Sequence, residues 1–173
     1  IKVLGRLVYF DYQDFFEKSI ENESNKVKAS ALEGLYYLNE EKAMEKAKEL
    51  PVSVKKAIAF PLAKMYFQKR EVSEMAFVAG YIIQGMYLGQ NKESKQLFEK
   101  AFQWVARSND VKAYENLLDD MVSKGIRYKQ YNFDQKMIEM MRQMVREQEL
   151  QANSNKKEMI ALVNLALVQL VRI

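Results

Sequence analysis

The scarcity of residues that break regular structure is the strongest constraint on how this chain folds. Its 173 residues include only two prolines and six glycines. An all-β sandwich or barrel needs turn residues roughly every 8 to 12 positions, and this chain cannot supply them. We therefore predict an all-α chain in which short polar links join the helices.

Capping and breaking residues divide the chain into roughly nine predicted helices. We expect them over residues 11–20, 25–38, 40–50, 52–68, 73–88, 91–107, 110–124, 134–151 and about 154–173. Residues 1–10 stay unassigned, because periodicity does not decide the structure of so short an apolar run.

Four residues set the predicted boundaries. Asn39 and Ser73 are expected to cap the helices that follow them, and Gly125 is expected to end the helix before it. Pro61 lies inside a predicted helix, where proline costs about 3 kcal/mol, so we expect a kink or break near residues 57–60.

Short links force consecutive helices to pack antiparallel, and a series of such hairpins stacks into a bundle or a curved solenoid. With 49% hydrophobic and 29% charged residues, the chain has the balance of a globular protein. The sequence shows no domain boundary and no strict repeat period. The prediction is one helical domain over residues 1–173, built as a degenerate HEAT-like superhelix.

Composition excludes several kinds of site. The sequence has no cysteine, histidine or threonine, which rules out disulfides, thiolate nucleophiles and histidine bases. Ser53 with Lys56, and Ser94 with Lys92, are the nearest serine and lysine pairs, and both serines stand where helix caps are expected. We predict no catalytic, cofactor-binding or metal-binding residue in this chain.

Charge and termini bear on partners and completeness. The net charge of +4 comes from basic residues interspersed with acids, as in residues 40–46, so nucleic acid is not expected as a partner. No signal peptide opens the chain and it begins at Ile1 rather than Met, so we expect a piece of a longer protein. The cellular compartment stays open.

One segment, Phe15 to Leu38 (FFEKSIENESNKVKASALEGLYYL), resembles a HEAT-type helix pair over about residues 11–38. Its small residues, Ala29, Ala31 and Gly34, would let the helices approach closely while Val27 and Leu35 fill the contact. Asn22 and Lys28 stand where such repeats often place Asp and Arg.

The continuation LNEEKAMEKAKELP and the helical remainder resemble the C-terminal helical domain of aminopeptidase N-like zinc metallopeptidases, the alanyl aminopeptidase family. The resemblance implies a noncatalytic domain that caps the active-site cavity, limits substrate access and contacts other domains of the parent. Zinc would be held in the parent's catalytic domain by a His-Glu-x-x-His helix and a distant Glu. The parent would remove N-terminal residues from peptides, and peptide would reach this chain only through the parent.

A free-standing helical-repeat scaffold that binds a partner protein or peptide through one concave face is the alternative. The sequence before Ile1 would distinguish the two: a zinc-binding helix supports the enzyme, whereas further repeats or a stop support the scaffold.

Two apolar segments have competing interpretations. Met137, Met140, Met141 and Met144 form one helical stripe, which fits an adaptable binding groove but more simply a packed core face. Met159 to Val171 is 13 residues long, too short for the roughly 20 of a membrane span. We predict that this last helix is buried nearly all round, between its own bundle and another domain.

Other polar or aromatic features receive structural interpretations. Arg127 to Phe133 interleaves basic and aromatic residues, which could stack nucleic acid bases, but its rings are expected to pack on helix ends. The carboxylate clusters are expected to be solvated helix faces, near Lys124 and Arg146, and the lone tryptophan a core anchor. These residues are Asp119, Asp120, Glu147, Glu149 and Trp104.

Overall fold

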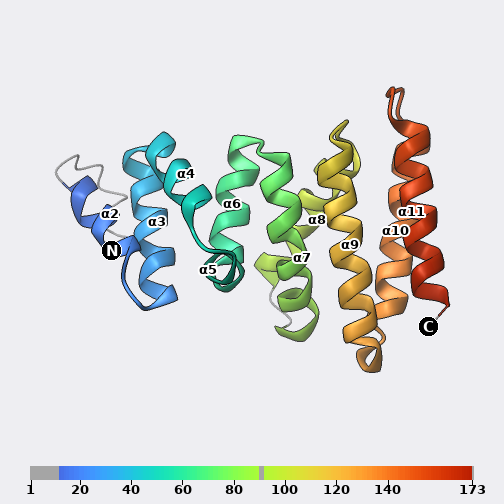
Figure 1. Cartoon of the computed structure of the whole chain (residues 1–173), viewed down its shortest axis with the longest axis horizontal. Coiled ribbons are helices and arrows are strands. Elements are labelled where there is room, and N and C mark those ends of the chain that lie inside the picture. The colour runs from blue at the N-terminus through green and yellow to red at the C-terminus, as the bar shows by residue number, and fades with distance from the viewer. Residues whose placement is uncertain (1–11, 90–91, 173) are drawn as a thin grey trace. The chain divides into compact units, whose positions relative to one another are not determined.

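The computed structural model describes residues 12–89 and 92–172, and within these ranges the chain forms ten α-helices, one 3-10 helix and no strand (Figure 1). The predicted all-α fold is confirmed. The chain divides into two compact units, a first unit of residues 1–69 and a second unit of residues 70–173. The single domain and the HEAT-like superhelix stay predictions, and the unassigned residues 1–10 lie outside the described part.

The first unit holds α2 (Gln13–Ile20), α3 (Asn25–Leu38), α4 (Glu40–Glu49), α5 (Val52–Ala57) and α6 (Ala59–Lys69). Consecutive helices α2, α3 and α4 pack side by side, and α6 contacts α3, α4 and α5. Apolar side chains fill the space between them: Phe16, Ile20, Ala31, Leu32, Leu35, Ala43, Met44, Ala47, Ile58, Leu62, Ala63, Met65 and Tyr66.

Pro61 divides the helix predicted over residues 52–68 into α5 and α6, which is why the structure has one helix more than expected. The proline ring nitrogen cannot donate to the carbonyl of Ala57. Ile58, between the two helices, leaves helical geometry with φ −113° and ψ 30°. The expected break near residues 57–60 is confirmed.

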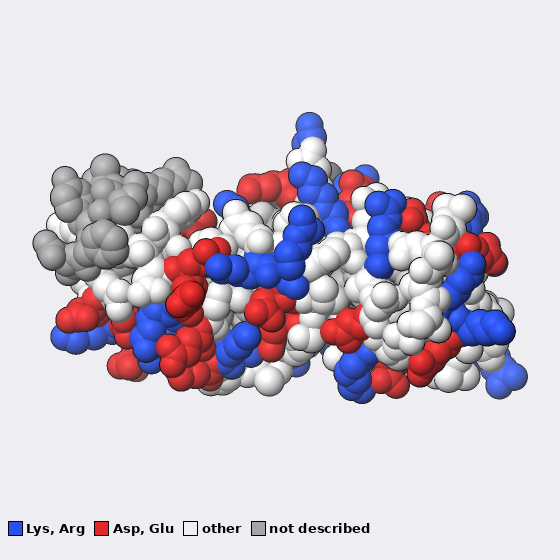
Figure 2. Space-filling model, turned by 90° about the horizontal axis from the view of Figure 1, so that it is seen from above, with Lys and Arg blue, Asp and Glu red and all other residues white. Residues whose placement is uncertain are grey.

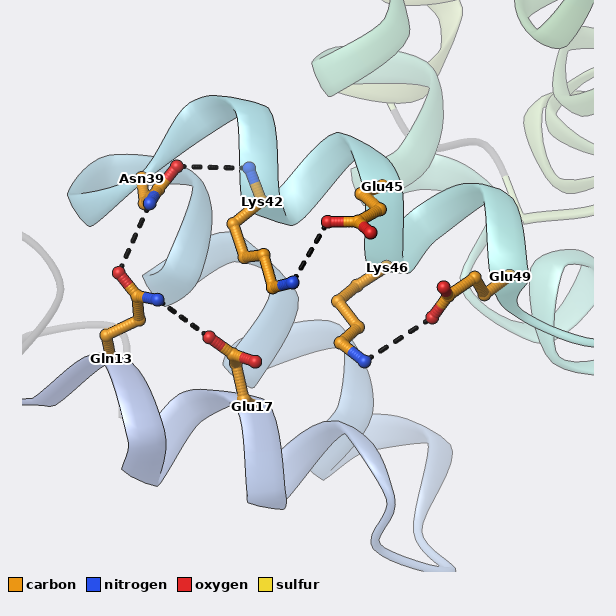
Figure 3. Close-up of polar contacts among 7 residues, drawn as sticks. All are labelled: Gln13, Glu17, Asn39, Lys42, Glu45, Lys46 and Glu49. Carbon is orange, nitrogen blue, oxygen red and sulfur yellow. Dashed lines mark hydrogen bonds and ion pairs between the residues drawn. The ribbon is translucent and has the colours of Figure 1, made fainter.

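Asn39 caps α4 as predicted and also connects α4 to α2 (Figure 3). Its Oδ1 accepts a hydrogen bond from the backbone N–H of Lys42 at 3.0 Å. Its amide donates to Gln13 Oε1 at 3.2 Å, and Gln13 Nε2 donates to Glu17 Oε1 at 2.8 Å. Two exposed ion pairs within α4 complete the cluster: Lys42 with Glu45, and Lys46 with Glu49.

Phe16 and Gly34 make the close helix contact that the HEAT-like pattern predicts. Phe16 is fully buried, and a Cβ on Gly34 would lie 2.7 Å from its Cζ and 2.8 Å from its Cδ1. Only glycine therefore lets α3 approach α2 at this point. Asn22 serves a local role, since its Oδ1 accepts from the N–H of Ser24 at 2.9 Å.

Glu40 joins three helices of the first unit. Its Oε2 lies 2.6 Å from Lys69 Nζ, and its Oε1 accepts from the Tyr36 hydroxyl at 2.5 Å. The hydrogen bond from Lys69 and then that from Tyr36 lower the pKa of Glu40 below its ordinary value of 4.5. The carboxylate therefore stabilises the first unit only while it is ionised.

This lowered pKa predicts an acid-sensitive stability. Because the folded-state pKa lies below the unfolded value, the contribution is complete above about pH 4.5 and is lost as the pH falls through the folded pKa. Glu40 is 43% exposed, so the effect is small. Urea unfolding from pH 6 to pH 3 should show less loss of stability in Glu40→Gln and Lys69→Gln than in the parent chain; an identical pH dependence would contradict the assignment.

The second unit holds α7 (Val72–Gly89), α8 (Lys92–Ala106), α9 (Val111–Arg127), the 3-10 helix η2 (Lys129–Tyr131), α10 (Phe133–Glu149) and α11 (Lys156–Val171). In this unit α7 packs on α8 and α9, while α11 packs on α9 and α10 (Figure 1). Gln148 near the end of α10 donates to the carbonyl of Ala106 at the end of α8, and Lys136 near the start of α10 lines one groove with Lys95 near the start of α8, so α8 and α10 run in the same direction.

Two predicted helix boundaries in the second unit are wrong. The backbone N–H of Met75 donates to the carbonyl of Glu71 at 2.9 Å, so α7 begins before Ser73, which lies inside it. Gly125 lies inside α9, which continues to Arg127. A Cβ there would lie 2.7 Å from Leu170 Cδ2, so this glycine allows close packing of α11 rather than ending a helix. Asp110, where a helix was predicted to begin, is the N-cap of α9, and its side chain accepts from the N–H of Ala113 at 2.9 Å.

Candidate functional site

A groove of the second unit lies between α7, α8 and α10 and has a volume of about 300 Å³. We name it the α8–α10 groove. Its floor is formed by Met86, Phe98 and Phe102, which are only 6%, 1% and 3% exposed, and by Met140, which lies half-buried beside them. The apolar surface that a ligand can reach is therefore mainly that of Met140 and of the half-buried Tyr87.

The two banks of the groove repeat one order of polar residues. On α8 the order is Lys95, Glu99 and Gln103, and on α10 it is Lys136, Glu139 and Gln143. Because α8 and α10 run in the same direction, the two lysines occupy one end, the two glutamates the middle and the two glutamines the other end. The groove therefore has a cationic end and an anionic middle.

Tyr87 lies where the charged groups meet. Lys136 Nζ stands 4.1 Å from the centre of its ring, and its hydroxyl donates to Met140 Sδ at 3.9 Å. Burial raises the pKa of Tyr87, and the negative charges of Glu139 and Glu99 raise it further. Both carboxylates are thus close enough to influence the same phenol from opposite banks.

The four charged residues of the groove have no ion-pair partner among residues 12–89 and 92–172. Lys95, Glu99 and Glu139 are exposed, and Lys136 is half-buried. Elsewhere in the second unit opposite charges do pair, as in Lys112 with Glu115 at 2.7 Å. The charges of the groove remain available to a ligand.

A polar cluster holds α8 and α10 together beyond the glutamine end of the groove. Gln148 is fully buried and its Nε2 donates to the carbonyl of Ala106 at the end of α8. Asn153 Nδ2 donates to Gln148 Oε1 at 3.0 Å, and Arg107 Nε lies 3.0 Å from Glu147 Oε2. These bonds fix the separation of the two banks.

The methionine stripe of α10 is mainly core, as the simpler interpretation predicts. Met137, Met141 and Met144 are fully buried. Met140 alone is different, because it is half-buried and lines the α8–α10 groove. Of the four methionines, only Met140 therefore fits the alternative interpretation of a binding groove.

For α11, predicted to be buried between its own bundle and another domain, the described residues test only the side that faces the bundle. Its inner side, Met159, Val163, Ala166 and Leu170, is buried. On its outer side three apolar residues are exposed beside the exposed Asn164: Leu165 is 59%, Val168 42% and Val171 66% exposed. We name these three residues the α11 outer face.

The segment Arg127 to Phe133 is structural for two of its three rings. Phe133 is buried and meets Tyr87 at 5.0 Å and Tyr128 at 5.8 Å between ring centres. The Tyr128 hydroxyl accepts from Gln84 Nε2 at 2.6 Å. Tyr131, however, is 54% exposed and does not pack as predicted.

The carboxylates predicted to be solvated behave in different ways. Asp119 and Glu149 are exposed, as expected. Asp120 instead forms an ion pair with Lys124, whose side chain is only 6% exposed. Glu147 is 20% exposed and pairs with Arg107, which follows α8, rather than with Arg146. Within the described ranges, no three Asp, Glu, His or Cys side chains converge as metal ligands.

Trp104 and the paired serines also depart from their predicted places. Trp104 is half-buried, with the Arg70 guanidinium 5.3 Å above its ring, so it is not a full core anchor. Ser53 is exposed inside α5, whose cap position is Pro51. Ser94 is the third residue of α8. Neither serine caps its helix.

Sequence reasoning missed the α8–α10 groove. The spacing of Lys95, Glu99 and Gln103 is that of one helix face, and it looks like any solvated face until α10 is placed opposite it. On the face seen in Figure 2, basic and acidic side chains are interspersed.

Comparison of the chain with models of known protein families, with curated protein sequences and with solved structures finds no match. No helix in the described part of the chain combines the length and apolar character needed to cross a bilayer.

Proposed function

We propose that this chain is a noncatalytic helical module of a larger polypeptide and docks on another domain of that polypeptide through the α11 outer face. The observation that carries the proposal is the exposure of Leu165, Val168 and Val171 on a single stripe. The parent we propose is an aminopeptidase N-like zinc enzyme, in which the module caps the active-site cavity and limits substrate access.

The apolar character of α11 on both sides supports a permanent neighbour. A helix at the surface normally places polar residues outward, whereas Met159 to Val171 contains no charged residue at all. Interfaces that never dissociate are more apolar than transient ones. A domain of the same polypeptide fits such a surface better than a transiently bound partner.

The proposal of a zinc aminopeptidase parent rests on the resemblance of the helix pair between Phe15 and Leu38, and of the helical remainder, to the C-terminal domain of that family. Gly34 against Phe16 gives that pair the close approach that the pattern requires. Since the sequence contains no histidine, the two histidine ligands of the metal would lie in another part of the parent. This module would then shape the route to the metal without touching it.

A free-standing scaffold that binds peptide is the second candidate, and the α8–α10 groove favours it. Its apolar floor and its charged banks without partners suit a peptide whether or not a catalytic domain exists. The groove and the α11 outer face are separate surfaces, so the two candidates can be tested independently.

Charges introduced on the α11 outer face should detach the module in the complete polypeptide. Leu165→Glu with Val168→Glu would place two carboxylates in a dry interface. We expect faster cleavage at the module boundary in limited proteolysis and weaker discrimination between long and short peptide substrates. Val52→Glu, at a valine that is 55% exposed in α5, is the matched control and should change neither.

Folding of the isolated chain separates detachment from damage. Because both substituted residues are exposed, the free energy of unfolding of the isolated chain should change by no more than about 0.5 kcal/mol. An unchanged cleavage pattern and unchanged peptide discrimination in the complete polypeptide would exclude docking through this face.

A further inference from the structure

We propose that the α8–α10 groove binds a short peptide with both termini free, its carboxylate at the lysine end, its ammonium between the glutamates and an apolar side chain on the floor. The inference is independent of the proposed parent enzyme, because it rests only on residues of the second unit.

The order of charges in the groove selects a ligand that carries both signs. Lys95 and Lys136 together would repel a polyamine, and Glu99 with Glu139 would repel a phosphate or a polyanion. A zwitterion satisfies both pairs at once. The lining is neutral as a whole, so net charge gives no reason to prefer an anion or a cation.

The distance between the two pairs matches a dipeptide. Lys95 and Glu99 are four residues apart on α8, and at 1.5 Å per residue this separates them by about 6 Å along the helix. An extended dipeptide spans about 7 Å at most. Its two ends can therefore reach the two pairs without distortion.

The size and lining of the groove fit a small ligand with an apolar side chain. A volume of about 300 Å³ lies at the lower end of the range of ligand pockets. Half-buried Met140 and Tyr87 form the contact surface for that side chain.

Lys136 is already positioned for a carboxylate. Its ammonium stands over the ring of Tyr87, and this cation–π contact limits the freedom that ligand binding would otherwise remove. The glutamates have no such support, so we expect the carboxylate to be the better-held end.

Methyl-methionine NMR on the whole chain, titrated with leucyl-phenylalanine, tests the location of binding. The resonances of Met86 and Met140, which line the groove, should shift in a saturable way. Met44 of α4 and Met159 of α11 are internal controls and should not shift. Absence of a saturable shift up to 20 mM peptide, or a shift of Met159 without one of Met86 and Met140, would overturn the proposal.

Peptides with blocked ends test whether the groove recognises the two charged termini. N-acetylation removes the ammonium and C-amidation removes the carboxylate, and each should weaken binding about tenfold. Glu99→Gln with Glu139→Gln should weaken binding of the free peptide by a similar factor and leave binding of the N-acetyl peptide unchanged. Lys95→Gln with Lys136→Gln should likewise weaken binding of the free peptide and leave binding of the C-amide peptide unchanged.

Matched substitutions outside the groove complete the design. Lys157→Gln with Glu158→Gln changes two exposed charges at the start of α11 and should leave affinity unchanged. Equal affinity for the free and the doubly blocked peptide would mean that the groove reads an internal chain segment, and the proposal would fall. Loss of the zinc aminopeptidase assignment would not affect any of these results.

Discussion

Replacing Gly80 by alanine is expected to destabilise the second unit by about 2 to 4 kcal/mol, although alanine is the better helix former by about 1 kcal/mol. Gly80 lies buried in α7, and a Cβ there would overlap the Asp120 carboxylate. That carboxylate is the ion-pair partner of Lys124. Displacing it would weaken its ion pair with the buried Lys124 ammonium, which also lies 4.2 Å from the centre of the Tyr81 ring, and breaking a buried pair by moving one partner is costly.

Gly85 provides a control in the same helix. A Cβ at Gly85 meets nothing within 4 Å, so Gly85→Ala should stabilise the unit by about 1 kcal/mol through helix propensity alone. Urea unfolding followed by the fluorescence of Trp104, the only tryptophan, measures both. In an Asp120→Ala background most of the cost of Gly80→Ala should vanish; an unchanged cost there would refute the mechanism.

Truncating Phe16 to alanine is expected to destabilise the first unit by about 3 to 5 kcal/mol. The ring is fully buried between α2 and α3, where Gly34 has no side chain that could fill the space it leaves. Hydrogen exchange of the α2 and α3 amides measures the loss locally.

Phe15 is the matched control for this substitution. It is 46% exposed and touches Phe16 edge-on, with 5.6 Å between ring centres. Phe15→Ala removes the same atoms from a place where water already reaches them, so the loss should stay near 1 kcal/mol. Equal effects at the two positions would contradict the close contact between Phe16 and Gly34.

Local chemistry made most of the helices predictable. Asn39 and Asp110 act through their own side chains on the backbone three residues ahead, and Pro61 acts through its missing N–H. Each signal needs only a few neighbouring residues. Ser73 and Gly125 are residue types that also cap or end helices, but packing overrides them. The helix α7 already begins at Val72, before Ser73, and α9 continues past Gly125, where α11 packs closely through Leu170.

Features that depend on distant residues were not predictable in the same way. Asp120 was predicted to be solvated because adjacent helix positions diverge by about 100° and so do not converge on one site, but the approach of Gly80 from α7 encloses it. The α11 outer face is apolar, and the sequence records that apolarity but not what covers it.

The α8–α10 groove shows the same limit at the level of a site. Lys95 and Lys136 are far apart in the chain, and nothing in the sequence states that α8 and α10 run in the same direction with equivalent charges facing each other. The four-residue spacing of Phe98 and Phe102 puts both rings on one side of α8, where both are buried. It could not show that part of this side is open to a ligand.

Zinc content and aminopeptidase turnover, measured side by side on the isolated chain and on the complete polypeptide that contains it, test the proposed function most directly. We predict that the complete polypeptide holds one zinc ion per chain and releases p-nitroaniline from alanyl p-nitroanilide, and that the isolated chain does neither. Stoichiometric zinc with turnover in the isolated chain, or a complete polypeptide with neither, would contradict the account.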